Sequence, residues 1–447
     1  MAEPWHTLLI VAASIAAVIV MVLRLRMQPF LALLLVALAT GLVFGGDPQT
    51  VIAAIRKGTG DALGYVAVVI GLGALLGGML EASGGVTAIA HKLLGAFGEK
   101  RIPWAMLAVG IVVGIPLFLD VAFIILAPLV ATLAVRAERR VAWFAIPLLA
   151  GLMAMHALLP PHPGPVAAAE LLHTDYGLMA IYGLACGIPA AIVSGPLYAR
   201  LFHAAPGWGE TSPPPMLDAG APQTETIGFG FALVAMLVPL VLIIAGAVAG
   251  QAMAAGPVKD AVLFIGHPFT ALILACLMVL GWLRVAKGTP FATLSRIMTR
   301  ALEPAGVMVL IIGAGAAYKE VLIESGAGTQ ITSVMTAAQV PVMLFAFLLA
   351  AFVRVAQGSA TVAMVTAAGL AAPMVAAASL SSGRIALVTV AIGAGATVLS
   401  HVNDTGFWLV RQYLGLTEAQ TLRSWTICAT IGGVTMFGVA LLLWPFA

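Results

Sequence analysis

Long apolar runs follow one another along almost the whole chain, each bounded by a few charged, glycine or proline residues. A helix needs about 20 predominantly apolar residues to cross the hydrocarbon core of a bilayer. Runs near that length predict membrane-spanning helices throughout the sequence. The ten predicted spans are Thr7–Leu23, Phe30–Gly46, Asp61–Leu80, Val141–Leu159, Leu178–Leu201, Gly228–Gly250, Val262–Leu283, Ala305–Ile323, Ile385–Trp408 and Trp425–Phe446.

Two further apolar regions, Pro103–Val135 and Pro341–Leu380, are interrupted near their centres. The first is split at Pro116-Leu117-Phe118-Leu119-Asp120 and the second at Arg354-Val355-Ala356-Gln357-Gly358-Ser359. Each split leaves pieces of about 15 residues, which are short for separate spans. Each region is therefore predicted to form a re-entrant hairpin.

Two other segments predict broken helices. The run from His156 to Pro165 holds two histidines, four prolines and a glycine, and Ser400–Gly406 interrupts a later apolar run with polar residues. Proline lacks an amide donor and clashes with the preceding turn, so a helix does not continue intact through the first segment. Within hydrocarbon, broken backbone is tolerated only where it is buried in protein or lines a watery cavity. The breaks therefore predict a functional cavity.

An internal repeat organises these elements. Ile70-Gly71-Leu72-Gly73 matches Ile312-Gly313-Ala314-Gly315, and a Ser-Gly pair follows each at the same offset of 242 residues. A split hairpin and a broken helix come after each match. The fold class predicted is an all-α polytopic membrane protein with two inverted repeats of five spans, the pattern of secondary transporters. The predicted parts are residues 1–203, a Pro- and Gly-rich cytoplasmic linker at 204–226, and residues 227–447.

Composition and charge agree with a membrane setting. The chain is 62% hydrophobic and 9% charged, with a mean hydropathy of +1.10, against about 25% charged residues in soluble domains. The basic residues lie in short loops, so the net charge does not indicate a nucleic-acid partner. With the N-terminus outside and both hairpins re-entrant, the positive-inside rule is obeyed. The predicted cytoplasmic residues include Arg24, Arg26, Lys100, Arg101, Arg136, Arg139, Arg140, Arg284, Lys287, Arg296, Arg300, Arg411 and Arg423.

Polar residues at the breaks are the candidate substrate ligands. Arg354 is the clearest candidate for a carboxylate because a guanidinium can grip both oxygens in a fork. The alternative interpretation is that it pairs with the hairpin backbone or reaches the surface. Hydroxyls and amides suit a polyhydroxylated solute, and half-helix N-termini attract anions. The predicted substrate-binding set is Arg354, Gly358, Ser359, Thr361, His162, Ser400, Asn403 and Thr405.

Ionisable residues inside a membrane are functional candidates by default. Asp120 at the first hairpin tip and Asp404 in the second break are candidate proton carriers, although Asp404 is equally suited to cap the half-helix that follows it. His156 and His162 could titrate near neutral pH, or they could hold the broken backbone by hydrogen bonds. The paired glycines at Gly71–Gly73 and Gly313–Gly315 indicate close helix packing.

At these motifs the sequence resembles the GntP family of gluconate:proton symporters, over almost its whole length. The most specific matches are Leu159-Pro160-Pro161-His162-Pro163-Gly164-Pro165, Gly358-Ser359-Ala360-Thr361-Val362-Ala363 and Ser400-His401-Val402-Asn403-Asp404. The resemblance implies a carrier of the ion-transporter superfamily type in the bacterial inner membrane. It also implies uptake of gluconate, or a related sugar acid or hydroxy acid, together with protons.

The chain departs from the family pattern at three places. Enteric gluconate carriers have Phe-Tyr-Glu where this chain has Phe118-Leu119-Asp120, leucine where it has Gln357, and proline where it has Thr405. These differences would alter the pocket. A carrier for D-serine or another small hydroxy acid is therefore the alternative within the same fold.

Other functions are less well supported. An intramembrane metalloprotease would be expected to carry an H-E-x-x-H motif, which the sequence lacks, and a channel would not need two inverted broken repeats. Cys186, Cys276 and Cys428 have no ligand spacing and are predicted to be packing residues, so neither a metal nor a cofactor is expected. Sodium coupling is open beside proton coupling, because unwound carbonyls with Asn403 and Asp404 could hold Na⁺. A homodimer is expected only by analogy with related folds.

Overall fold

The computed structural model describes residues 4–98, 101–137, 139–203, 227–327, 341–402 and 404–447. The predicted linker at 204–226 and the candidate ligand Asn403 lie outside these residues. Every regular element in the described ranges is a helix. The three cysteines are buried and free, which agrees with their expected packing role.

The first half ends at α10. Its helices are α1 (Pro4–Leu23), α2 (Pro29–Val43), α3 (Pro48–Ala82), α4 (Gly85–Phe97), α5 (Ile102–Gly114), α6 (Leu119–Arg136), α7 (Val141–Leu158), α8 (Pro163–Leu172), α9 (Tyr176–Ile192), the π-helical turn η2 (Val193–Leu197) and α10 (Tyr198–His203).

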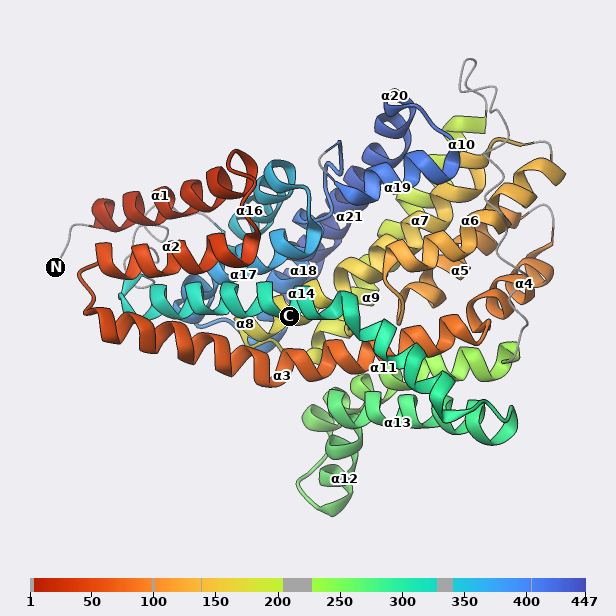
Figure 1. Cartoon of the computed structure of the whole chain (residues 1–447), viewed down its shortest axis with the longest axis horizontal. Helices are drawn as coiled ribbons and strands as arrows, with labels where there is room; N and C mark the ends of the chain where they lie inside the picture. The colour runs from red at the N-terminus through yellow and green to blue at the C-terminus, as the bar shows by residue number, and fades with distance from the viewer. Residues whose placement is uncertain (1–3, 99–100, 138, 204–226, 328–340, 403) are drawn as a thin grey trace.

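The second half begins with two helices joined by a short one that projects from the body of the molecule (Figure 1). Its elements are α11 (Phe229–Ala252), α12 (Pro257–Gly266), α13 (Pro268–Gly281), η3 (Trp282–Ala286), α14 (Phe291–Glu324), α16 (Val342–Gln357), α17 (Ala360–Ala377), α18 (Ser382–Gly395), α19 (Thr405–Leu414), α20 (Glu418–Thr421), η4 (Leu422–Thr426), α21 (Ile427–Leu443) and η5 (Trp444–Phe446).

The two long helices α3 and α14 are the equivalent members of the two halves, and they run side by side in opposite directions (Figure 1). A Cβ placed on Gly58 would meet the Ala316 carbonyl oxygen at 2.5 Å, and one on Gly78 would meet the Ala301 Cβ at 2.5 Å. The residue numbers on α3 rise as those on α14 fall, so the contact is antiparallel. The predicted inverted arrangement of the halves is confirmed.

The paired glycines serve the packing expected of them. A Cβ on Gly73 would lie 2.6 Å from the Pro161 side chain, and one on Gly315 would lie 2.3 Å from Val365 Cγ1. Each long helix therefore approaches a segment of the central region so closely that a side chain at these positions would displace it.

Eight helices in the described ranges are long and apolar enough to cross a membrane. Seven overlap predicted spans, some extending more than ten residues beyond them, and the eighth is Ala360–Ala377, the second arm of the second hairpin. At 1.5 Å per residue, its 18 residues reach about 27 Å. The predicted span Ile385–Trp408 is instead divided between α18 and α19. The hairpin arms are thus unequal, with 13 and 18 residues in α5 and α6 and 16 and 18 in α16 and α17.

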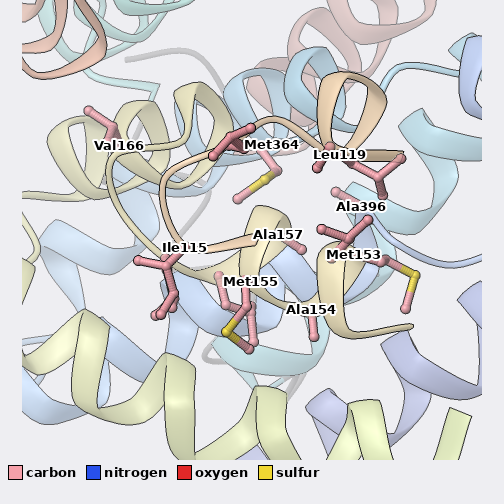
Figure 2. Packing of buried hydrophobic residues seen from close by; sticks show 14 of the residues in the cluster. Ile115, Leu119, Met153, Ala154, Met155, Ala157, Val166, Met364 and Ala396 are labelled. Carbon is pink, nitrogen blue, oxygen red and sulfur yellow. The ribbon is translucent and has the colours of Figure 1, made fainter. Parts of the chain in front are cut away.

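Among the eight long apolar helices of the described ranges, the one that contains α7 is the most buried. The apolar window of Val141–Leu172 is 89% buried, against 33–50% for several peripheral spans. A helix that is apolar on all sides is surrounded by protein or by lipid, and this one is surrounded mainly by protein. Figure 2 shows apolar side chains gathering around the breaks from the first hairpin tip, from α7, α8 and α17, and from the end of α18. The labelled residues are Ile115, Leu119, Met153, Ala154, Met155, Ala157, Val166, Met364 and Ala396.

Candidate functional site

The two hairpin tips and the two broken helices meet at one cavity of about 250 Å³. This volume lies below the range of about 300–1,000 Å³ that is typical for drug-sized ligands, so the cavity suits a small solute. Its lining residues are Phe118, Leu119, Asp120, Val121, Met153, His156, Ala157, Pro163, Pro304, Met308, Arg354, Ser359, Ala360, Thr361, Ala396, Thr397, Asp404, Thr405, Gly406 and Trp425.

Four helices begin at the cavity wall. Leu119 opens α6, Pro163 opens α8, Ala360 opens α17 and Thr405 opens α19. The first turn of a helix has amide groups without intrahelical partners and carries about half a positive charge. Proline fits the first position of α8 because that position needs no amide donor. Four converging N-termini therefore make the cavity attractive to an anion.

Arg354, in the last turn of α16, is buried and forms an ion pair with Asp404 across the cavity wall. The exposed fractions of the two side chains are 5% and 9%. Arg354 Nη2 donates to Asp404 Oδ2, and Nη1 donates to the Gly358 carbonyl. The backbone contact expected as one alternative is therefore present, and both terminal nitrogens are occupied. Nε is buried and makes no hydrogen bond within the described ranges.

Asp404 combines a capping role with the ion pair. Its Oδ1 accepts from the Gly406 amide at 3.0 Å, which caps the N-terminus of α19. Its Oδ2 accepts from Arg354 and from Ser400 Oγ. The carboxylate thus links the tip of the second hairpin to the break between α18 and α19.

Trp425 and Thr426 hold the Asp404 carboxylate in place indirectly, through Ser400. Trp425 Nε1 donates to Ser400 Oγ at 2.6 Å, and Thr426 Oγ1 donates to the Ser400 carbonyl. Ser400 is buried, contacts Asp404 and is not among the residues that line the cavity. Both partners lie on the π-helical turn η4, a distortion often found at functional sites.

The remaining predicted ligands are placed differently. Ser359 caps α17 through the Val362 amide, and Thr361 and Thr405 also line the cavity. Gly358 has φ +89°, a left-handed conformation that ends α16 and that glycine adopts without strain. Asp120, in the first turn of α6, is exposed and also lines the cavity.

The two histidines differ in role. His162 is fully buried outside the cavity lining, and its Nε2 lies 2.7 Å from the Gly114 carbonyl. This bond ties the first broken helix to the end of α5, as expected for a backbone-holding histidine. His156 lines the cavity, with its ring centroid 4.7 Å from that of His162.

Several cavity residues were not predicted from the sequence, namely Phe118, Met153, Thr397 and Trp425. Phe118 belongs to the motif that interrupts the first hairpin, so its place at the hairpin tip could have identified it as a cavity residue. The others lie in apolar runs where no polar pattern distinguishes them from packing residues.

A known structure shares this architecture. The chain aligns with the crystal structure of the Alcanivorax borkumensis YdaH transporter with a TM-score of 0.66, covering 94% of this chain and 98% of that one. The sequence identity is 15%, so this likeness concerns the fold alone.

Closer relatives extend over nearly the whole length. The chain is 37% identical to a gluconate permease of Pseudomonas aeruginosa, covering 99% of this chain and 98% of the relative. It is 37% identical to the high-affinity gluconate transporter of Escherichia coli, with coverages of 95% and 96%. It is 35% identical to the L-idonate transporter of the E. coli Gnt-II system, with the same coverages.

These relatives are named as permeases or transporters, not as enzymes. The molecule is accordingly a multi-pass transporter of the bacterial inner membrane. A family model described as GntP family permease matches residues 6–446. The chain belongs to the GntP permease family.

Proposed function

We propose that this permease imports gluconate, or a closely related sugar acid or hydroxy acid, by proton symport. The observation that carries the proposal is the convergence of four helix N-termini on one small cavity that also holds Arg354. Such a site favours a carboxylate. Ser359, Thr361 and Thr405 line the same cavity, and their hydroxyls suit the hydroxyl groups of a sugar acid.

The relatives support the same class of substrate. Two of them are named for gluconate and one for L-idonate, which is another sugar acid. The departures at Leu119, Gln357 and Thr405 leave a smaller hydroxy acid such as D-serine as the alternative. Competition between unlabelled acids decides between these substrates.

The Arg354–Asp404 pair supplies a way to couple the proton to the anion. In the structure, Asp404 occupies one terminal nitrogen of the guanidinium and neutralises its charge. When Asp404 takes up a proton, it loses that negative charge, and Arg354 gains an unbalanced positive charge beside the cavity. A substrate carboxylate would restore the balance, because an unpaired buried charge is costly. Proton and anion then bind together, with Asp120 as the second carboxylate on the cavity wall.

Uptake into proteoliposomes tests the proposed function directly. Labelled gluconate is supplied with an imposed inward proton gradient and no sodium, and unlabelled L-idonate and D-serine act as competitors. Saturable accumulation that a protonophore abolishes is the expected result. If accumulation requires sodium, the coupling ion is sodium and not the proton. Absence of gluconate uptake by folded protein, together with uptake of another acid, would overturn the substrate.

Variants of the charged residues in the cavity test the coupling of proton and anion. Asp404→Asn should keep gluconate exchange across the membrane while losing accumulation driven by the proton gradient. Asp120→Asn reports whether the second carboxylate shares this role, and Arg354→Lys tests the need for a planar guanidinium. Size-exclusion elution shows that each variant is folded. Proton-driven accumulation by Asp404→Asn at the parent level would show that Asp404 is not the coupling group.

A further inference from the structure

A second cavity of about 380 Å³ lies beside the first. It is formed by the C-terminal part of α3, the tip of the first hairpin and the N-terminal half of α14. We call it the inner cavity. Its lining residues are Ala74, Gly77, Gly78, Glu81, Ala82, Pro116, Leu117, Phe118, Val121, Ile297, Arg300, Ala301 and Pro304.

The two cavities share one wall. Phe118, Val121 and Pro304 line both of them. The Phe118 ring is the largest of these groups, and its centroid lies 6.2 Å from that of His156 and 5.9 Å from that of His162. Phe118 thus lies between the inner cavity and the two histidines, of which His156 lines the central cavity.

The inner cavity lies on the basic side of the protein. Arg284, Lys287 and Arg296 precede or open the part of α14 that lines it. Short basic loops mark the cytoplasmic side of a bacterial membrane protein. The inner cavity therefore lies between the central site and the cytoplasm.

Two opposite charges face the inner cavity. Arg300 is exposed and Glu81 is half-buried, and neither has an ion-pair partner in the described ranges. A guanidinium can bind a carboxylate through two hydrogen bonds, while an ionised carboxylate accepts hydrogen bonds from hydroxyl groups. Together they match the two ends of a hydroxy acid. Pro304 has no amide hydrogen to donate to the Arg300 carbonyl, which leaves a further acceptor at this wall.

We propose that the inner cavity is a second binding site for the transported hydroxy acid, occupied between the central site and the cytoplasm, with Phe118 as the barrier between the two sites. Arg300 binds the carboxylate and Glu81 the hydroxyl groups. This inference rests on the proposed function, because it takes the same substrate class.

Thiol labelling tests the site. Ala82, an exposed residue of the inner cavity, is changed to Cys in a background carrying Cys186→Ala, Cys276→Ala and Cys428→Ala. A membrane-impermeant maleimide should label Ala82→Cys in inside-out vesicles but not in right-side-out ones. Gln251→Cys, which lines a separate pocket near α12, is the control and should show the reverse pattern.

Protection by gluconate then separates the two sites. Gluconate should slow labelling of Ala82→Cys, and this protection should persist when Arg354→Ala weakens the central site. Arg300→Gln should raise the gluconate concentration needed for protection by about tenfold or more. The second site would be overturned if Arg354→Ala abolished the protection and Arg300→Gln left it unchanged. If the proposed function itself is wrong, the parent protein will show no gluconate uptake. If only the second site is wrong, gluconate uptake by the parent protein will remain.

The barrier is tested with a reporter in the central cavity. Ala360→Cys lines that cavity at the start of α17. Phe118→Ala should speed its labelling from the cytoplasmic side by about tenfold or more, and Phe118→Leu should give an intermediate rate. Phe118→Leu also serves as the milder variant if the alanine variant does not fold. Equal labelling rates in the parent and in a folded Phe118 variant would overturn the barrier role.

Discussion

Ser400 contributes to the site without touching the cavity. It donates to Asp404 and accepts from Trp425, so its single hydroxyl joins the capping carboxylate to η4. Asp404 is thereby held in the orientation that pairs with Arg354. A buried hydroxyl with both roles filled fixes one rotamer, whereas a missing partner leaves a buried polar group without compensation.

Removing the indole donor tests this support. Trp425→Phe should lower gluconate affinity several-fold and stability by about 1 kcal/mol, because Ser400 loses one hydrogen bond and Asp404 loses its fixed position. Trp408→Phe is the matched control, since Trp408 Nε1 donates to the Val402 carbonyl at 2.8 Å away from the cavity. Equilibrium binding and thermal unfolding in detergent measure both effects. Equal losses in the two variants would contradict the argument.

Sequence patterns located Arg354 and Asp404 because charges stand out in an apolar chain. The same patterns did not reveal that the two residues pair with each other, since the contact joins α16 to the break before α19, 50 residues apart. Trp425 could not be identified for a related reason. Its chemistry is a single N–H on a largely apolar ring, and only the folded backbone shows what that N–H meets.

Among the helices, α8 is anchored at its C-terminal end. His173 ends it in a left-handed conformation, and Lys319 Nζ of α14 lies 3.3 Å from His173 Nε2. Burial and the Lys319 charge lower the pKa of His173 below its ordinary 6.5, while Glu320 opposes this shift. Neutral His173 can accept a hydrogen bond from Lys319, but protonated His173 cannot.

This arrangement predicts a dependence of stability on pH. Because its folded-state pKa is lowered, His173 binds fewer protons in the folded state than in the unfolded chain. His173 should therefore contribute a loss of stability as the pH falls below about 6.5. His173→Gln should reduce the difference in melting temperature between pH 7.5 and pH 5.5. An unchanged difference in the variant would exclude His173 as a contributor.

Element lengths were predicted less well than element types. The split motifs correctly marked both hairpin tips, because glycine, proline and charged residues interrupt apolar runs there. The second arm α17 nevertheless has the length and composition of a span. Burial explains this, since α17 packs against α8, α14 and α16 and needs an apolar surface on every side. An apolar composition indicates that a helix is shielded from water, but it does not show whether lipid or protein surrounds the helix.

For the whole molecule, the antiparallel contact of α3 with α14 joins the two halves. Glycines bring the two backbones close together along this contact, and Lys57 of α3 forms an ion pair with Glu320 of α14 near one end. The repeat, together with an odd number of five predicted spans in each half, predicted that the halves were inverted. It did not predict that their equivalent helices would lie against each other, because a repeat relates sequences and contains no information about which faces meet.

Substitutions at two glycines of α3 distinguish the contribution of this contact to stability from the effect of helix propensity. In Gly58→Ala the new Cβ would lie 2.5 Å from the Ala316 carbonyl oxygen and 2.7 Å from the Glu320 Cβ. Backbone cannot move aside cheaply, so overpacking should destabilise the protein by about 1–3 kcal/mol. Gly60→Ala, two residues along, places its Cβ where no atom lies within 4 Å and should be neutral or stabilising by up to about 1 kcal/mol. Melting temperatures in detergent compare the two variants. Equal melting temperatures would show that α3 and α14 separate before the rest of the fold unfolds, whereas a selective loss in Gly58→Ala makes their contact part of the cooperative unit.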